Sequence, residues 1–318
     1  MDRTEVKVSR KDIIDATRVV YRHCIRTPLF FDYYLSGKLR ADVYLKMEMF
    51  QPVRAFKIRG ASNKMSHVAG DSVVTASSGN HGLAVAYVAK AMGKKAAIVL
   101  PENVNESKLR LIKSLGAETV ISGLTTDDRM ATAKRLSETR GMTMIPPFDD
   151  PLVIAGQGTA GLEIQTQTRC DYVISPVGGG GLISGIALAY DNVGGTEVIG
   201  AQSEKSRSMY ESLSAGKPVT SKSETVADGI AVSTPGTLNV GILAGRVRRI
   251  LLVSDAEIMS AVKEMWQNSR VLMEPASAST VAALLKYRRE ILGEGGQSVA
   301  LIISGGNVSD SLLKSLAQ

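Results

Sequence analysis

Short apolar runs alternate with helix-like patterns along most of this chain, beginning near residue 71. The β-branched run at residues 73–76 stops at a Ser/Gly-rich segment, and apolar positions then recur at helical spacing over residues 80–92 until Gly93. This order is typical of βα units, which build parallel sheets. The same pattern predicts further strands at residues 96–100, 119–121, 142–145, 172–175, 197–201, 249–253 and 299–303, and further helices at residues 106–115, at 127–140 and after Pro151.

This order of elements predicts two α/β lobes, each with an open, mostly parallel sheet. We expect a small domain at residues 53–147 and a large domain built from residues 1–52 and 148–318. Such sheets bind ligands at the carboxyl ends of their strands, so the cleft between the lobes is the expected site. The GxGxxG motif of dinucleotide-binding proteins occurs at residues 156–161, but it follows a Pro/Asp-rich loop rather than a strand, which disfavours that function.

Composition and charge exclude several classes of protein. With 318 residues, 44% of them hydrophobic, the chain is long enough for two domains with cores of their own. The net charge of +7 comes from scattered Lys and Arg, and five Phe and one Trp offer little base stacking, so nucleic-acid binding is disfavoured. Cys24 and Cys170 form no metal-binding motif, which indicates reduced thiols and no metal site. No apolar stretch approaches the ~20 residues that span a bilayer, so we expect a cytoplasmic protein without a membrane partner.

Lys57 is the first candidate for chemistry. It follows Phe56 and opens a helical pattern at Ile58, so its amine is expected to project from a helix start into the cleft. Burial would lower the pKa of that amine and make it a usable base, and Phe56 offers a flat apolar face beside it. A single lysine is more often a surface residue, so Lys57 gains significance only from three later segments.

A run of four glycines is the second candidate. Gly178, Gly179, Gly180 and Gly181 follow a predicted strand, and Leu182 opens an apolar helix after them. Bare backbone N–H groups and a helix N-terminus can together surround a phosphate group. Tight strand-to-helix packing is the alternative reason for glycine at these positions.

The segment Ser-Ser-Gly-Asn-His-Gly lies at another strand-to-helix junction. The amides and hydroxyls of Ser77, Ser78 and Gly79 are expected to bind a substrate carboxylate, and the Asn80 amide to reach a ring hydroxyl. A plain helix cap is the alternative. His81 is grouped with these substrate-binding residues, although a histidine here is by itself more typical of a cap or a core.

Ser304 ends the last predicted strand and begins the segment Ser-Gly-Gly-Asn. Its hydroxyl is a neutral partner for a pyridine nitrogen, and a turn-forming serine is the alternative. An amine, an anion-binding turn, a phosphate cradle and a neutral ring-nitrogen partner are the groups that a pyridoxal-phosphate enzyme needs. Together the four segments therefore favour pyridoxal 5′-phosphate as cofactor, held as a Schiff base on Lys57.

In this order, the four segments resemble those of the fold-type II pyridoxal-phosphate enzymes of the threonine dehydratase and serine racemase family, over nearly the whole chain. The resemblance implies that Lys57 carries the cofactor, that Phe56 stacks beside its ring and that Asn80 contacts its 3′ oxygen. It also implies that residues 178–181 bind the phosphate and that Ser304 contacts the pyridine nitrogen. Residues 227–232 and 274–278 are further matches, the former to the catabolic dehydratases.

Two departures from the family pattern bear on the substrate. Arg54 lies in the segment where the family usually has small residues before its Phe-Lys pair, so a cation is expected near the site, where it could pair with an acidic substrate side chain. The acidic cluster that binds metal in serine racemases is missing at the matching residues 202–208.

These observations predict a pyridoxal-phosphate-dependent lyase that removes water from a β-hydroxy amino acid such as threonine or serine and releases a 2-oxo acid and ammonia. Lys57 would remove the Cα proton. One alternative is an amino-acid racemase acting on serine, in which Ser78 would serve as a second acid/base on the opposite ring face. A 3-hydroxyaspartate dehydratase using Arg54 and a catalytically idle cofactor-binding protein are the others. We expect a small amino-acid substrate and a homodimer or homotetramer.

Overall fold

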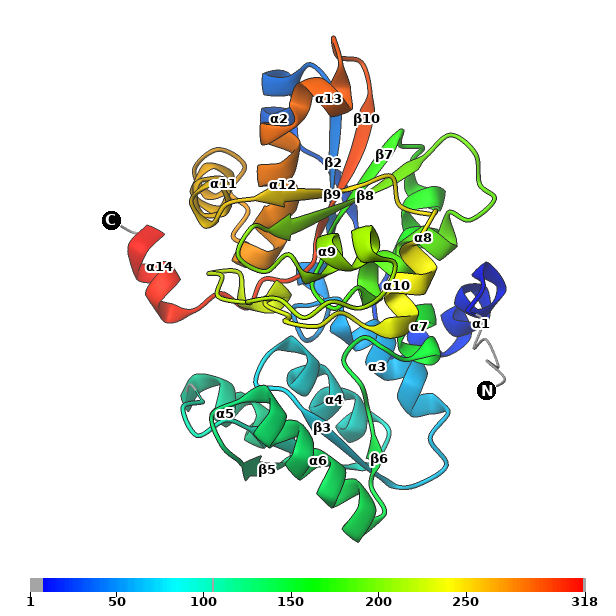
Figure 1. Ribbon diagram of the computed structural model, residues 1–318, viewed down its shortest axis with the longest axis vertical. Helices are drawn as coiled ribbons and strands as arrows, with labels where there is room; N and C mark the ends of the chain where they lie inside the picture. Colours follow the sequence, from blue (N-terminus) through cyan, green and yellow to red (C-terminus); the bar gives the residue numbers. More distant parts are fainter. Residues whose placement is uncertain (1–7, 105, 317–318) are drawn as a thin grey trace.

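The computed structural model describes residues 8–104 and 106–316, and within them two sheets lie toward opposite ends of the molecule (Figure 1). The larger sheet has six strands in the order β1 (Leu29–Phe31), β2 (Asp42–Met47), β10 (Ser298–Ile303), β7 (Tyr172–Pro176), β8 (Glu197–Ser203) and β9 (Ile250–Val253). Strand β1 is antiparallel to β2, and the other neighbours are parallel. The smaller sheet is parallel throughout, in the order β5 (Glu118–Ile121), β4 (Lys95–Leu100), β3 (Ser72–Ala76) and β6 (Thr143–Met144).

Helices cover both faces of the six-stranded sheet, which explains why its central strands are apolar on both sides. One face packs against α7 (Pro151–Gln167), α8 (Gly181–Ala189), α9 (Ser208–Ala215) and α10 (Thr237–Leu243). The other face packs against α2 (Tyr33–Leu39), α11 (Asp255–Asn268), α12 (Pro275–Lys286) and α13 (Arg288–Leu292), and α14 (Asp310–Leu316) follows β10. None of the described helices is both long and apolar enough to cross a membrane.

The four-stranded sheet is also enclosed on both faces. Val73 packs with α3 (Lys57–Ser66), α4 (Asn80–Ala91), α5 (Glu106–Ser114) and the N-terminal helix α1 (Arg10–Val20). Its neighbour Val74 points the other way and packs with α6 (Thr126–Arg140). Because successive strand residues alternate between faces, two adjacent valines serve two separate cores.

Capping explains where helices α6 and α7 begin. Asp150 accepts hydrogen bonds from the backbone N–H groups of Leu152 and Val153, and Pro151 occupies the first helical position of α7, where no N–H group is needed. Thr125 and Asp128 form a reciprocal capping box at the start of α6. These local signals fix the start of α6 at Thr126 and of α7 at Pro151.

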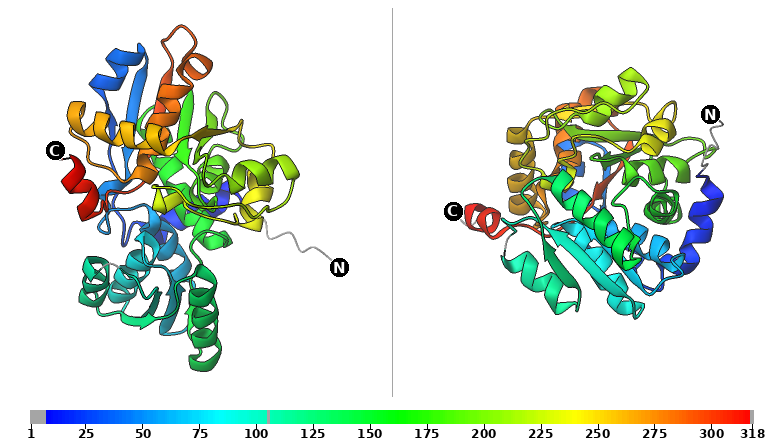
Figure 2. Two further views of the ribbon diagram at one scale, coloured as in Figure 1. Left: turned by 60° about the vertical axis from the view of Figure 1, so that its left-hand side comes forward. Right: turned by 60° about the horizontal axis from the view of Figure 1, so that its bottom comes forward.

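Helix α3 lies at the junction of the two lobes, against both α7 and α4, and Figure 2 shows the junction from two further directions. The contact with α7 is close because it is lined with glycine: a Cβ added at Gly156 would lie 2.6 Å from the Arg59 carbonyl oxygen, and one at Gly158 2.7 Å from the Gly185 carbonyl oxygen. The GxGxxG sequence of residues 156–161 thus lies inside a helix, where its glycines permit close packing.

The predicted α/β fold with mostly parallel sheets is confirmed, and each predicted strand is present within two residues of its predicted ends. The sequence reading missed β1 and β2, which extend the large sheet beyond β10. The division into domains at residues 53 and 147 stays a prediction.

Candidate active site

A cavity of about 300 Å³ lies where the carboxyl ends of β3, β7 and β10 meet between the lobes. This is the position at which parallel α/β sheets bind ligands. Its wall is formed by Phe56, Lys57, Ala76, Ser77, Ser78, Gly79, Asn80, His81, Arg129, Pro147, Phe148, Pro176, Gly178, Gly179, Gly180, Gly181, Leu182, Asp228, Gly229, Ile230, Ala231, Val232, Glu274, Ala276 and Ser304. Among the residues predicted for the site, the structure brings all but Arg54 to this wall.

Lys57 is the first residue of α3, and its side chain enters the cavity. The Nζ atom donates a hydrogen bond of 2.8 Å to the carbonyl oxygen of Pro147 and lies 5.2 Å from the centre of the Phe56 ring. Burial lowers the pKa of the amine from 10.5 to about 8, since a charged ammonium is poorly solvated here and no carboxylate of the described residues compensates. The amine therefore loses its proton near pH 8, well below the usual range of a lysine.

A short antiparallel contact joins the Lys57 segment to the Ser304 segment. The Phe56 N–H group donates to the Ser304 carbonyl oxygen at 3.0 Å, the Gly306 N–H group donates to the Arg54 carbonyl oxygen at 2.9 Å, and Ala55 pairs with Gly305. These backbone bonds bring together two segments about 250 residues apart in the sequence. Lys57 and Ser304 thus face one cavity because their backbones are directly paired.

The glycine run forms the turn from β7 into α8 and leaves space at the helix N-terminus. Gly180 is the N-cap of α8 and has φ +98°, a conformation that favours glycine. A Cβ added at Gly179 would lie 2.4 Å from the Phe148 ring. The first N–H groups of a helix have no acceptor within the helix, so the turn presents donors and a positive dipole end to the cavity. Such a cradle fits a phosphate group.

The turn of residues 77–82 connects β3 to α4. A Cβ added at Gly82 would lie 2.1 Å from the Ser77 carbonyl oxygen, so the tight turn requires glycine there. The Asn80 Nδ2 atom donates to both carboxylate oxygens of Glu274, at 2.9 and 3.1 Å, and its Oδ1 atom accepts from Asn307 Nδ2 at 2.8 Å. Asn80 is thereby held against the loops of the large lobe.

His81 is a neutral residue in the wall of the cavity. Its Nε2 atom lies 2.9 Å from the Ile145 carbonyl oxygen, which can only accept, so Nε2 carries the proton. Burial, together with the nearby charge of Lys57, lowers the pKa of the ring to about 3. The Nδ1 atom is buried and has no hydrogen-bond partner among the described residues. His81 therefore presents an acceptor and no charge.

Ser304 is buried at the end of β10, and its Oγ atom lies 3.1 Å from the Oγ atom of Ser277. The side chain is uncharged and lines the cavity, so it can serve a ring nitrogen as donor or acceptor.

Arg54 lies outside the cavity wall. Its side chain is exposed, its backbone has φ +56°, and its guanidinium lies beside Gly306. The cation that does line the wall besides Lys57 is Arg129, which enters from α6. Sequence reasoning missed Arg129, because nothing in the pattern of a charged surface helix distinguishes it from its neighbours.

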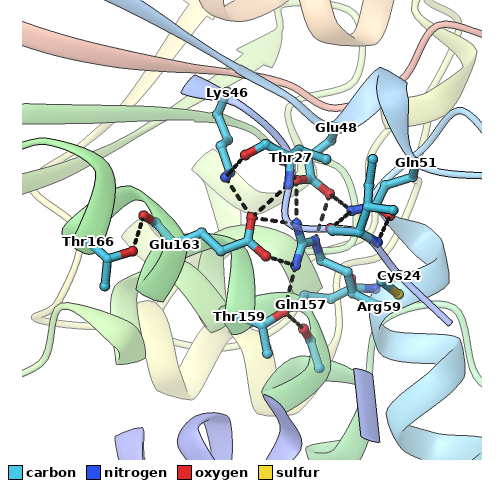
Figure 3. A network of polar contacts seen from close by, with 12 residues as sticks. Cys24, Thr27, Lys46, Glu48, Gln51, Arg59, Gln157, Thr159, Glu163 and Thr166 are labelled. Carbon is cyan, nitrogen blue, oxygen red and sulfur yellow. Dashed lines mark hydrogen bonds and ion pairs between the residues drawn. The ribbon is translucent and has the colours of Figure 1, made fainter. Parts of the chain in front are cut away.

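A buried cluster of charges surrounds Arg59, the residue two positions after Lys57 (Figure 3). The Arg59 guanidinium, two residues along α3, makes four bonds of 2.7–2.9 Å to the carboxylates of Glu48 and Glu163, and Lys46 Nζ lies 2.6 Å from Glu163. Burial acts to raise the pKa of Glu48, but the charge and hydrogen bonds of Arg59, the charge of Lys46 and the hydrogen bond from Thr27 together outweigh it and hold that pKa below its usual value. Two cations and two carboxylates thus neutralise each other and fix α3 to α7 and the large sheet.

The fold and this cavity define a class, that of enzymes with an amine, an anion cradle and a neutral hydroxyl around one site. A family model described as "Pyridoxal-phosphate dependent enzyme" matches residues 20–305. The chain belongs to this family, whose cofactor is pyridoxal phosphate.

Relatives and solved structures agree with that assignment. An L-threonine ammonia-lyase from Thermotoga maritima is 38% identical over 313 residues, which cover 96% of this chain and 77% of the relative. The processed form of threonine deaminase isoform 2 from Solanum lycopersicum superposes with a TM-score of 0.91 at 34% sequence identity. The match covers 96% of this chain and 86% of the deaminase chain. Maize serine racemase superposes with a TM-score of 0.92 at 32% sequence identity, and the match covers 97% of this chain and 96% of the racemase chain.

The residues present fit the cofactor. At the cradle of residues 178–181, a Cβ on Gly179 would lie 2.4 Å from the Phe148 ring, so the backbone there stays bare, and the buried amine of Lys57 has a hydrogen-bond acceptor but no counter-ion among the described residues. Among the described residues, no group of three or more His, Cys, Asp and Glu side chains is placed to hold a metal ion.

Proposed function

We propose that this protein is a pyridoxal-phosphate-dependent ammonia-lyase that removes water from a β-hydroxy amino acid such as threonine or serine. The products are a 2-oxo acid and ammonia. The observation that carries the proposal is the Lys57 amine, buried at the carboxyl ends of the sheets with a pKa of about 8 and facing a glycine-lined helix N-terminus. The kinship to threonine ammonia-lyases supports the reaction.

The roles of the residues follow from their positions in the wall. We assign Lys57 as the residue that carries the cofactor and takes the Cα proton at Nζ, Phe56 as a flat support for the ring, and residues 178–182 as the phosphate cradle. When bound, pyridoxal phosphate supplies an electron sink for the bond broken at Cα. Ser304 would hold the ring nitrogen, and the Asn80 amide, whose Nδ2 atom donates to Glu274 in this structure, would reach the ring oxygen.

Substrate would be held by the turn of residues 77–81. Ser77, Ser78 and Gly79 offer hydroxyls and an N–H group at the start of α4, where a carboxylate is favoured. His81 offers an acceptor at Nδ1 and stays neutral above about pH 3, so it does not repel the substrate ammonium. Elimination needs one base at Cα, and Lys57 is suited to that role because its amine titrates near neutral pH.

Borohydride reduction of the holoenzyme, followed by peptide mapping, tests the assignment of Lys57. The reduced cofactor is expected on Lys57, and its appearance on another lysine would refute the assignment. A screen of L-threonine, L-serine and 3-hydroxyaspartate for ammonia release tests the reaction. Bound cofactor without release from any of them would favour an idle cofactor-binding protein.

Two alternatives use particular residues. Ser78 lies in the cavity wall and supports a racemase activity if it protonates Cα from the face opposite Lys57. A 3-hydroxyaspartate dehydratase needs a cation for the second carboxylate, and Arg129 in the wall is better placed for this than the exposed Arg54. Loss of 3-hydroxyaspartate activity in Arg129→Met but not in Arg54→Gly would support this substrate; an equal response of both variants would count against it.

We also propose a cytoplasmic homodimer or homotetramer. Cys24 and Cys170 are free buried thiols, as expected in a reducing compartment. Exposed aromatic side chains at the edge strand β1 and near it, namely Phe30, Tyr33 and Phe50, support a surface for self-association. Light scattering of the wild type and of Tyr33→Glu tests this, and a monomeric wild type would refute it.

A further inference from the structure

Ser277 lies next to Ser304 and has hydrogen bonds that the proposed function does not yet use. It is fully buried in the first turn of α12. Its Oγ atom lies 2.9 Å from the Gly305 backbone nitrogen, 2.9 Å from the Gly305 carbonyl oxygen and 3.1 Å from Ser304 Oγ. Three partners thus surround one hydroxyl, which has a single proton and two lone pairs.

The roles of two partners follow from their chemistry. The Gly305 N–H group can only donate, so it occupies one lone pair of Ser277 Oγ, and the Gly305 carbonyl oxygen can only accept. Two proton arrangements remain. In the first, Ser277 donates to the carbonyl oxygen and accepts from Ser304, whose free lone pairs then face the cavity. In the second, Ser277 donates to Ser304, whose proton then faces the cavity.

In both arrangements the backbone groups of Gly305 keep a hydrogen-bond partner. The Gly305 carbonyl oxygen also accepts from the Glu274 N–H group at 3.1 Å, so it keeps a partner when the Ser277 proton turns away. The two arrangements differ by rotation of two hydroxyl protons, with no movement of heavy atoms. The second arrangement needs an acceptor in the cavity for the Ser304 proton, whereas the first offers an acceptor to the cavity.

We propose that Ser277 is a positioning residue that lets Ser304 present either a proton or a lone pair to the ring nitrogen of the cofactor. The inference rests on the proposed contact between Ser304 and that nitrogen. An unprotonated ring nitrogen is matched by the second arrangement and a protonated one by the first. Without Ser277, the Ser304 proton loses its side-chain acceptor among the described residues, so the arrangement that turns the Ser304 lone pairs to the cavity is no longer stabilised. The protonated ring would then face a weaker acceptor.

The test is a pH titration of the holoenzyme loaded with pyridoxal phosphate labelled with ¹⁵N in the ring, because the ¹⁵N chemical shift reports the proton on that nitrogen directly. We expect the wild-type ring nitrogen to take up a proton within the pH range in which the enzyme is folded. In Ser277→Ala, the proton affinity should fall about tenfold or more, the size expected for losing one hydrogen bond to a charged group.

Ser279→Ala is the matched control. Ser279 is buried in the same helix, and its Oγ atom donates to the Ala276 carbonyl oxygen at 2.7 Å, within its own turn. Its removal should leave the ring titration unchanged. If Ser277→Ala does not fold, Ser277→Cys replaces it, and its weaker donor and acceptor should lower the proton affinity in the same direction.

The outcomes separate this inference from the role of Ser304. A ring nitrogen whose titration responds to Ser304→Ala but not to the Ser277 variants would overturn the inference and leave Ser304 in place. If Ser304→Ala leaves the titration of the ring nitrogen unchanged, the contact with Ser304 is refuted, and the inference with it. A wild-type ring nitrogen that takes up no proton in the folded range would also overturn the proposed switch.

Discussion

Replacing Lys57 by methionine should stabilise the cofactor-free protein while abolishing cofactor attachment. The Lys57 amine is buried in the cavity wall with no carboxylate partner in the described part of the chain, and methionine has a similar length without a charge. Sites that hold a reactive group in an unfavourable state cost stability, and removing the group recovers that stability. Lys57→Met is therefore expected to raise the free energy of unfolding at neutral pH.

The size and sign of the effect follow from the pKa of the amine. Its fall from 10.5 to about 8 corresponds to about 3 kcal/mol, at 1.36 kcal/mol per tenfold change in proton affinity. Below pH 8 the amine is protonated in both states, and the folded state bears this whole cost. Between pH 8 and 10.5 the unfolded chain binds the additional proton, so the stability of the wild type rises with pH. Loss of the bond to Pro147 offsets about 1 kcal/mol, which leaves a gain of about 2 kcal/mol at pH 7.

Urea unfolding of both proteins, freed of cofactor with hydroxylamine, measures the difference at pH 7 and pH 10. The gain at pH 7 should shrink by pH 10. Lys64→Met is the matched control on the same helix, because Lys64 pairs with Asp150 at 2.6 Å and its loss should give no gain. A variant no more stable than the wild type at pH 7, or a gain independent of pH, would refute the reasoning.

Three further predictions concern the cradle, the charge cluster and the second face of the site. Gly179→Ala places a Cβ 2.4 Å from an aromatic ring and should weaken cofactor binding about tenfold in an absorbance titration, whereas Gly194→Ala, which meets open space, should not. Arg59→Met removes the cation beside the buried Glu48 carboxylate and leaves Glu163 with Lys46 alone, and it should lower the free energy of unfolding by about 3–5 kcal/mol, against less than about 1 kcal/mol for the exposed Arg140→Met; equal losses would refute this. Ser78→Ala should abolish interconversion of D- and L-serine and spare ammonia release, and a parallel loss of both would show that Ser78 binds substrate instead.

Local sequence patterns were sufficient to predict most of the parallel strands, because buried strands are continuous apolar runs between turn residues. The two strands that escaped prediction lack this pattern. Strand β1 has three residues with a half-exposed Phe30 at its centre, and β2 contains Lys46, a charge that is fully buried only because Glu163 lies beside it. Strand β2 depends on pairing with β10, which lies far along the sequence, and β1 depends in turn on pairing with β2.

The motifs predicted which segments line the site. Nearness to Lys57 in the sequence wrongly predicted that Arg54 lies there too. Arg54 is three positions from Lys57, yet the turn at φ +56° leaves its side chain exposed. Arg129 reaches the wall from a helix that no motif marks. Both positions depend on how the two lobes are placed, which no local pattern specifies. The Asn80–Glu274 contact likewise joins two motifs that the sequence gives no reason to pair.

Helix α3 shows how one element gives two cations opposite properties. Lys57 and Arg59 are two residues apart, and a helix turns about 200° over two residues, so their side chains leave on different sides. Arg59 faces α7 and is neutralised by two carboxylates that bind it at both edges. Lys57 faces the cavity, where burial without a carboxylate lowers the pKa of its amine. The cluster that fixes Arg59 therefore holds the reactive amine in place without supplying the negative charge that would keep it protonated.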